Sequence, residues 1–303
     1  MAASSVGSTV AATIAYDQLR AQAFLDYLDA VTPANSEGTL STVPTVFGGN
    51  FQARTSSDSD PPVNWLILAN MTTQVNVAQK NLTGGYLNQP GYPPSPLVLQ
   101  ALDSVDAFLT AFVSKLKANN LDTSTLIIVA AKHGQAPINP TLFKEIDPAL
   151  ITAQVGVPIA HQTSDDIALI WLNSTSDITT ATENLARNAT ALRILNIFAG
   201  ANASAFGFGS PLTDERVPDV IVQPELGTIF TTSKKKMAEH GGLSNDDRNV
   251  ACFVSHPSLK KTVFNETVGT TQVAPTVLQV LGLDVRELQA VGAQGVQVLP
   301  GFV

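Results

Sequence analysis

Apolar residues recur with helical spacing in some segments of the chain and in short unbroken runs in others. In residues 14–30, the apolar positions from Ile14 to Leu28 fall on one face of a helix. A longer pattern of the same period covers 97–119, and the preceding Ser95-Pro96 supplies a cap and a first turn. Both segments are therefore predicted to be amphipathic helices.

The unbroken apolar runs indicate strands that are covered on both faces. The clearest run is Leu126–Ala131, which shows no alternation and is typical of a buried parallel strand. We expect further strands at 43–47, 167–172, 217–222 and 249–255, and further helices at 141–152, 177–195 and 269–281. Strands that alternate with helices predict an α/β fold in which a mostly parallel sheet carries helices on both faces.

Composition limits the class of protein. The 303 residues are 44% hydrophobic and 14% charged, which suits a large packed core, and we expect one domain over 1–303. The formal charge of −8 provides no basic field for a nucleic-acid polymer, and the densest basic cluster is Lys234-Lys235-Lys236. No apolar run reaches the roughly 18 residues of a membrane span.

Glycosylation sequons point to an extracellular location. Asn-x-Ser/Thr sequons begin at Asn70, Asn81, Asn173, Asn188, Asn202 and Asn265. The first ten residues lack the cationic start and the apolar core of a signal peptide. We nevertheless expect a secreted or extracellular glycoprotein on the strength of the sequons.

Two histidine-glycine pairs are the strongest candidates for chemistry. Of four histidines, His133 follows the strand at 126–131 after one residue, Lys132, and both it and His240 precede a glycine. A histidine at the carboxyl end of a strand can face the crevice where open α/β sheets bind ligands. Asp165-Asp166 is a pair of carboxylates at the start of the strand 167–172, for which a solvated strand entrance is the alternative. Two imidazoles with one or two carboxylates at strand ends could bind a divalent metal such as zinc. An ordinary surface or core role is the alternative for each histidine.

Two further polar residues are candidates for substrate binding. The ammonium group of Lys132 would be repelled by a metal dication unless an anion lay between them, so it is expected to contact phosphate or a carboxylate. Asn50 follows the predicted strand 43–47 after Gly48-Gly49, and its amide could orient a substrate. A surface position is the alternative for Lys132, and a solvated loop is the alternative for the lysines at 234–236.

Several stretches together resemble a known family. They are Lys132-His133-Gly134-Gln135, Asp165-Asp166 with the strand that follows, Arg216-Val217-Pro218-Asp219, Glu239-His240-Gly241-Gly242 and Gln272-Val273-Ala274-Pro275-Thr276. From about residue 15 onward the chain is similar to the type I phosphodiesterase/nucleotide pyrophosphatase family of the alkaline phosphatase superfamily. The resemblance implies an α/β/α sandwich with a mostly parallel central sheet.

The resemblance also implies a reaction and a cofactor. Family members hydrolyse phosphoric diesters or pyrophosphates, which are small phosphate-ester substrates, with two divalent metals, usually zinc. A Thr or Ser nucleophile forms a covalent phosphoryl intermediate. His133 matches the histidine of the family's Asp-His-Gly metal motif, and His240 matches the later metal histidine.

The chain departs from the family pattern in ways that bear on activity. Lys132 stands where the motif carries a metal-binding Asp, and no Asp-x-x-x-His motif follows Phe47. Nothing in residues 1–14 supplies the first-strand Asp or the nucleophile, so we expect a carboxyl-terminal portion that lacks the first strand or strands. Residues 53–74 are expected to be an insertion or loop.

Three functional hypotheses follow. The first is a metal-dependent phosphodiester or pyrophosphate hydrolase that is crippled in this chain because the nucleophile is absent. The second is a catalytically inactive anion-binding pseudoenzyme that uses Lys132, His133 and His240. The third is a related hydrolase of sulfate or phosphonate esters, which shares the metal scaffold.

Overall fold

The computed structural model divides the chain into two compact units, 1–112 with 133–249 and 113–132 with 250–303. The residues that it describes are 10–34, 36, 38–49, 96–131, 133–134, 136–137, 141–207, 209–232 and 238–302. The predicted insertion at 53–74 and the candidate Asn50 lie outside these residues. The single domain expected over 1–303 stays a prediction.

Two long helices match the helical patterns of the sequence. Helix α1 covers Val10–Leu28, and α3 covers Pro96–Ala118. The ring of Phe24 on α1 lies 6.2 Å from that of Phe108 on α3 and 5.6 Å from that of Phe47. The strand predicted at 43–47 is wrong, because the structure has no strand in 38–49. Phe47 packs against the aromatic rings of the helices instead.

The largest sheet among the described residues has four strands in the order β4-β5-β7-β6. Their bounds are Ile159–Ser164 (β4), Ala168–Leu172 (β5), Ile194–Ala199 (β6) and Val220–Pro224 (β7). All three strand pairs are antiparallel, so the mostly parallel sheet predicted from the sequence is wrong for this part of the chain. The turn between β4 and β5 is too short for the crossover that a parallel pair needs.

The strands predicted at 167–172 and 217–222 correspond to β5 and β7, the two central strands of this sheet. Their residues are mostly buried, which produces the unbroken apolar runs in the sequence. Such a run indicates that a strand is covered on both faces, whether the adjacent strands are parallel or antiparallel to it. The burial of these strands is therefore predicted correctly, and their direction is not.

The helix predicted at 141–152 divides into a strand and a helix. Strand β3 (Lys144–Ile146) pairs in parallel with β8 (Thr228–Phe230), the one parallel pair of the described residues. Helix α4 (Pro148–Val155) begins after Asp147, whose side chain accepts a hydrogen bond from the Ala149 N–H. Proline at the first helical position disfavours helix before it, so the helix cannot extend back into β3.

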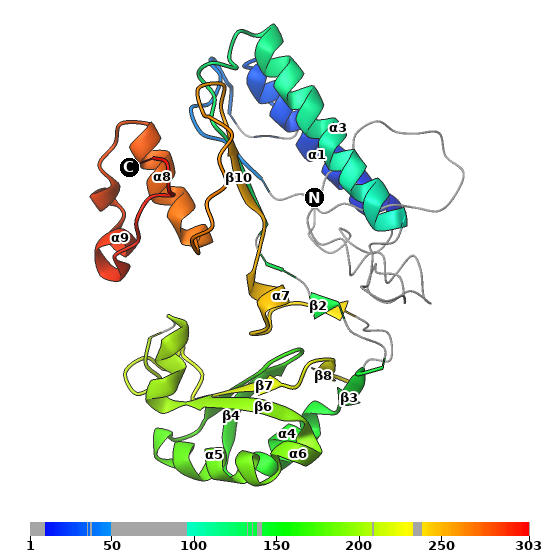
Figure 1. Cartoon of the computed structure of the whole chain (residues 1–303), viewed down its shortest axis with the longest axis vertical. Helices are drawn as coiled ribbons and strands as arrows, with labels where there is room; N and C mark the ends of the chain where they lie inside the picture. Colours follow the sequence, from blue (N-terminus) through cyan, green and yellow to red (C-terminus); the bar gives the residue numbers. More distant parts are fainter. Residues whose placement is uncertain are drawn as a thin grey trace. The chain divides into compact units, whose positions relative to one another are not determined.

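The helix predicted at 177–195 is shorter and interrupted. A 3₁₀ turn (η1, Thr175–Asp177) leads into α5 (Ile178–Arg187), which is followed by α6 (Ala189–Leu192). Figure 1 shows α4, α5 and α6 gathered beside one face of the four-stranded sheet. Their apolar side chains and those of the strands form one core, with Ile151, Val155, Ile170, Leu185 and Phe230 fully buried.

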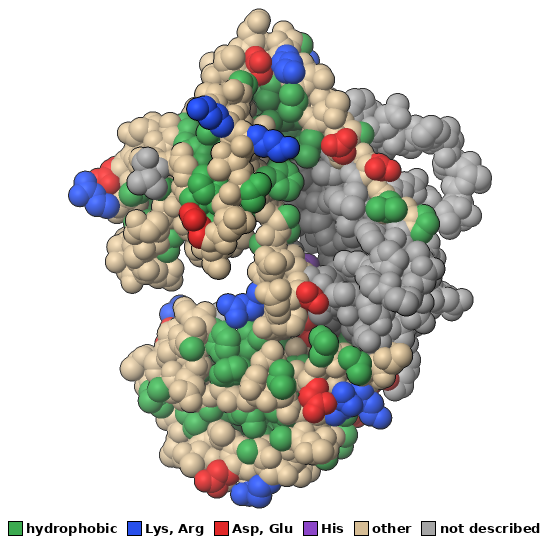
Figure 2. All heavy atoms as spheres, viewed as in Figure 1, with side chains coloured by type: hydrophobic (Ala, Val, Ile, Leu, Met, Phe, Trp, Pro, Cys, Tyr) green, Lys and Arg blue, Asp and Glu red, His purple; other side chains and the backbone are tan. Residues whose placement is uncertain are grey.

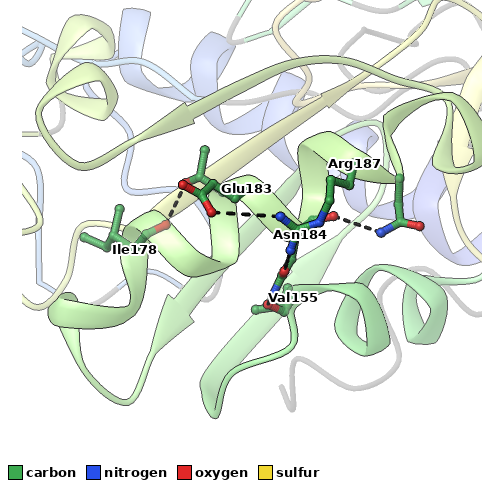
Figure 3. A network of polar contacts seen from close by, with 7 residues as sticks. Val155, Ile178, Glu183, Asn184 and Arg187 are labelled. Atoms are coloured by element: carbon green, nitrogen blue, oxygen red, sulfur yellow. Dashed lines mark hydrogen bonds and ion pairs between the residues drawn. The ribbon is translucent and has the colours of Figure 1, made fainter.

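A polar contact ties α5 to the end of α4 inside this layer. The Asn184 side-chain N–H₂ donates a hydrogen bond to the Val155 carbonyl oxygen over 3.0 Å, and Arg187 donates to the Asn184 side-chain oxygen. Figure 3 shows Asn184 pointing from α5 toward Val155. The neighbouring ion pair Arg187–Glu183 spans 3.9 Å between side chains that are each 65% exposed, so it contributes little.

The second unit is built on a short ribbon of two strands. Strand β1 (Ile127–Ala130) pairs antiparallel with β10 (Cys252–Ser255). The predicted strand at 126–131 therefore exists, but it is half-buried in an antiparallel pair rather than enclosed in a parallel sheet.

Short helices follow this ribbon. They are α8 (Val273–Val280) and α9 (Gln289–Gln294), with the 3₁₀ turns η3 (Thr270–Gln272) and η4 (Val285–Glu287). The helix predicted at 269–281 corresponds to η3 and α8 together. A further 3₁₀ turn, η2 (Gly200–Phe206), follows β6 in the first unit.

Charged side chains of both signs are interspersed with apolar ones over the face of the described residues drawn in Figure 2. Neither sign dominates that face. None of the described helices has the length and hydropathy that a bilayer crossing requires.

Replacing Asn184 with Ala is expected to destabilise the first unit by about 1 kcal/mol, because the carbonyl of the buried Val155 loses its donor. Glu183→Ala, one residue away and exposed, is the control and should stay within about 0.5 kcal/mol. Urea unfolding of both variants measures the difference. Equal midpoints for the two variants would contradict the role assigned to Asn184.

Two exposed Asp-x-Arg turns, one in each unit, hold their carboxylates ionised. Arg216 hydrogen-bonds to Asp214 and lowers the pKa of Asp214 to about 2, and Arg286 does the same to Asp284. A depressed folded-state pKa stabilises the fold above the unfolded value of about 3.9, and this stabilisation is lost as pH falls toward 2. Carboxyl NMR titration should show Arg216→Ala raising the pKa of Asp214 while Arg286→Ala leaves it unchanged. If the pKa of Asp214 stays near 2 in Arg216→Ala, the hydrogen bond from Arg216 is not what lowers it.

Candidate functional site

The structure brings the two histidine-glycine segments together within the first unit. Strand β2 (Ala136–Pro137), just after His133, pairs antiparallel with β9 (Ala238–Glu239), just before His240. The two imidazole rings stack, with centroids 3.8 Å apart and planes inclined by 15°. The two histidines predicted as candidates from the sequence are therefore direct neighbours in space.

A backbone contact fixes the tautomer of His133. Its Nδ1 lies 2.7 Å from the carbonyl oxygen of Gly134. A carbonyl oxygen only accepts, so Nδ1 carries the proton and Nε2 carries the lone pair. Nε2 is buried and has no hydrogen-bond partner among the residues that the structure describes. A buried acceptor without a donor is costly, and binding of a cation would satisfy it.

The stacked geometry limits how the two rings can bind metal. The lone pair of an imidazole nitrogen lies in the plane of its ring, and two nearly parallel planes 3.8 Å apart give lone pairs that do not converge on one ion. Metal ions in two-metal sites lie about 3.5–4 Å apart. The pair therefore fits two ions, one on each ring, better than one shared ion.

Helix α7 (Asn245–Arg248) packs against the backbone beside His133. The Gly134 N–H donates to the Asp247 carbonyl oxygen over 2.7 Å. A Cβ atom at Gly134 would lie 1.9 Å from the Asp246 carbonyl oxygen. Only glycine permits this approach, so the lack of a side chain at 134 sets the position of the His133 segment.

Two carboxylates meet at Gly242, two residues after His240. Oδ2 of Asp247 and Oδ2 of Asp166 lie 2.7 and 2.9 Å from the point that a Cβ of Gly242 would occupy. Asp247 is 6% exposed, and its Oδ2 accepts a hydrogen bond from the Ser244 hydroxyl over 2.6 Å. Asp166 is a candidate from the sequence, whereas Asp247 is not. The only signal for Asp247 is the Ser244-x-x-Asp247 spacing of a helix cap.

The other sequence candidates make contacts of their own or lie outside the described residues. Lys132 and the lysines at 234–236 belong to the second group, as does Asn50. Asp165 lies in the turn between β4 and β5, where its carbonyl oxygen accepts from the Phe230 N–H. Of the remaining histidines, His161 packs against Trp171, and His256 contacts the Thr123 carbonyl oxygen in the second unit.

The described residues provide some of the ligand atoms that a metal ion needs. His133 and His240 offer imidazole nitrogens, which suit zinc. Over the part of the chain that the structure describes, no group of three or more His, Cys, Asp or Glu side chains is arranged to hold a metal ion. Catalytic zinc usually takes three protein ligands, so the described residues supply an incomplete set.

Gly134→Ala is expected to separate the stacked rings, because its methyl group would collide with the Asp246 carbonyl oxygen. We expect a loss of about 2–3 kcal/mol of stability, within the range for overpacking a tight contact. Gly292→Ala is the control, because nothing lies within 4 Å of a Cβ at Gly292. Thermal unfolding compares the two variants, and equal midpoints would contradict the close approach at Gly134.

Solved structures that the chain resembles include three hydrolases. Human ectonucleotide pyrophosphatase/phosphodiesterase 5 is 16% identical, with 66% of this chain and 51% of that chain covered at a TM-score of 0.49. Wild-type alkaline phosphatase PafA is 16% identical, with 66% and 43% covered at a TM-score of 0.46. Phosphonoacetate hydrolase from Sinorhizobium meliloti 1021 is 18% identical, with 55% and 44% covered at a TM-score of 0.39.

These likenesses have TM-scores below 0.5 and do not define the fold. The chain spans about half the length of the human protein that it matches. A search of curated proteins finds no match. The sequence profile described as Type I phosphodiesterase / nucleotide pyrophosphatase matches residues 13–258, which is most of the chain. The chain therefore belongs to the type I phosphodiesterase/nucleotide pyrophosphatase family.

Proposed function

We propose that this protein is a metal-dependent hydrolase of phosphoric diesters or pyrophosphates that acts on small phosphate esters. Membership of the family supports the class of reaction. The observation that carries the proposal is the stacked pair His133–His240, in which Nε2 of His133 is buried without a hydrogen-bond partner.

Each imidazole would hold one divalent ion, zinc by resemblance. Bound zinc would polarise a phosphoryl oxygen and lower the pKa of bound water. The residues of this chain prepare the ligands. The Gly134 carbonyl oxygen fixes the tautomer of His133, and outer contacts of this kind orient metal-binding histidines in other proteins.

We also propose that turnover by these 303 residues is slow, and that Lys132 and Asn50 contact substrate phosphate. Lys132 stands where the family's motif carries a metal-binding Asp, so one ion would lose an anionic ligand and gain a repelling neighbour. Stabilisation of the transition state of phosphoryl transfer depends on positioned metals and cations. A metal ion that is bound less tightly therefore lowers the rate of hydrolysis. The nucleophile stays unassigned.

A second candidate, an anion-binding pseudoenzyme, is favoured by the same lysine. The ammonium group of Lys132, which precedes His133 in the sequence, would bind phosphate or a nucleotide without metal. The two candidates differ in which solute stabilises the protein, and the third, a sulfate- or phosphonate-ester hydrolase, differs only in the ester that is cleaved.

We also propose that the protein is a secreted or extracellular glycoprotein. The Asn residues that begin the sequons at Asn173, Asn202 and Asn265 are exposed. An exposed asparagine in a sequon is accessible to a glycan, which supports this part of the proposal.

Zinc is expected to raise the thermal midpoint of the wild-type chain, because a ligand that binds only the folded state at 100 times its Kd adds about 2.7 kcal/mol. His133→Ala and His240→Ala should each reduce this shift, while His161→Ala, which removes an exposed histidine on β4, should keep it. Hydrolysis of a nitrophenyl phosphodiester should be barely measurable.

Stabilisation by phosphate but not by zinc would replace the hydrolase proposal with the anion-binding one. Fast zinc-dependent hydrolysis that His240→Ala abolishes would contradict slow turnover. Preferential cleavage of a sulfate or phosphonate ester would replace phosphate esters with that ester as the proposed substrate class.

A further inference from the structure

Asp247 contacts the segments of both stacked histidines. Its carbonyl oxygen accepts from the Gly134 N–H, next to His133, over 2.7 Å. Its Oδ2 lies against Gly242, two residues after His240, at 2.7 Å from the position of a Cβ there. One residue therefore touches the polypeptide on each side of the imidazole pair through two different groups.

We propose that Asp247 is a positioning residue that holds His133 and His240 in their stack. Its place in phosphoester hydrolysis rests on the proposed function, whereas its effect on the stack does not. The Ser244 hydroxyl donates to Oδ2 over 2.6 Å and accepts from the Asp247 N–H over 3.2 Å. These two bonds fix the side chain at the first turn of α7, so Oδ2 cannot turn away from Gly242.

The burial of Asp247 is more than a helix cap requires. The cap of α7 is Ser244, yet Asp247 is 6% exposed, and among the described residues its second oxygen, Oδ1, is buried without a hydrogen-bond partner. Burying a carboxylate is costly unless a cation or further donors are near. A buried carboxylate against Gly242, two residues after His240, is suited to a site that binds cations.

Asp246 provides a matched control on the same turn. It is exposed, and it is adjacent to Asp247 on α7. Asp246→Ala removes the same group and the same charge as Asp247→Ala and keeps the backbone contacts with Gly134. A difference between the two variants therefore reports the position of the Asp247 carboxylate rather than loss of one charge from α7.

The test is NMR of the histidine ring protons in the full chain, assigned with His133→Ala and His240→Ala. Stacked rings shift each other's protons upfield. We expect Asp247→Ala to lose this shift, Asp246→Ala to keep it, and Asp247→Asn to restore it, because the Asn side-chain oxygen also accepts from Ser244. Zinc affinity should fall roughly tenfold or more in Asp247→Ala, the usual loss when an outer contact of a metal ligand is removed.

Retention of the upfield shift in folded Asp247→Ala would overturn the proposal. If Asp247→Ala does not fold, Ser244→Ala replaces it, since it removes the hydroxyl that fixes Oδ2 and caps α7 but keeps the Asp247 carboxylate. A partial loss of the shift in that variant supports the proposal, and an unchanged shift overturns it. If the wild-type chain shows the stack but binds no zinc, the proposed hydrolase function fails while the ring shifts still decide the role of Asp247.

Discussion

The close approach of Gly134 to α7 is the constraint on which the site depends. At this point a backbone N–H and a carbonyl oxygen meet over 2.7 Å, and a methyl group would leave no room. Because Gly134 follows His133 directly, the same contact sets where that imidazole lies. The β2–β9 pair aligns His240 from the other side. Local backbone packing thus brings together two histidines that are distant along the chain.

The electrostatics of this region follow from that packing. Within the described part of the chain, Nε2 of His133 and Oδ1 of Asp247 are buried acceptors without donors. Each is unfavourable without a cation, and both become favourable when positive charge is bound. Nearly parallel rings direct their lone pairs separately, so the arrangement accommodates two ions more readily than one. The proposed binding of cations rests on this arrangement.

The elements with a local burial pattern could be predicted from the sequence. Helices α1 and α3 and strands β5 and β10 lie where the apolar patterns predict them, and the glycine neighbours of His133 and His240 identify the two histidines. The predicted strand direction is wrong, because an apolar run reports burial and not the identity of a partner strand. The strand predicted at 43–47 is wrong because Phe47 packs against aromatic rings rather than in a sheet.

Asp247 could not be found from the sequence for a related reason. Ser244-x-x-Asp247 is an ordinary capping pattern, and nothing local shows that the cap packs against Gly134. Lys132 is recognisable as a departure from the family, yet its consequences depend on side-chain positions that sequence does not specify. A long-range contact between short segments decides the position of Asp247.

The central claim is that the imidazoles of His133 and His240 each bind their own ion. Anomalous X-ray diffraction at the zinc absorption edge, from crystals grown with zinc, measures this directly. The expected result is two peaks, one beside Nε2 of His133 and one beside His240. A single peak bound by both rings, or no peak near either ring, would contradict it.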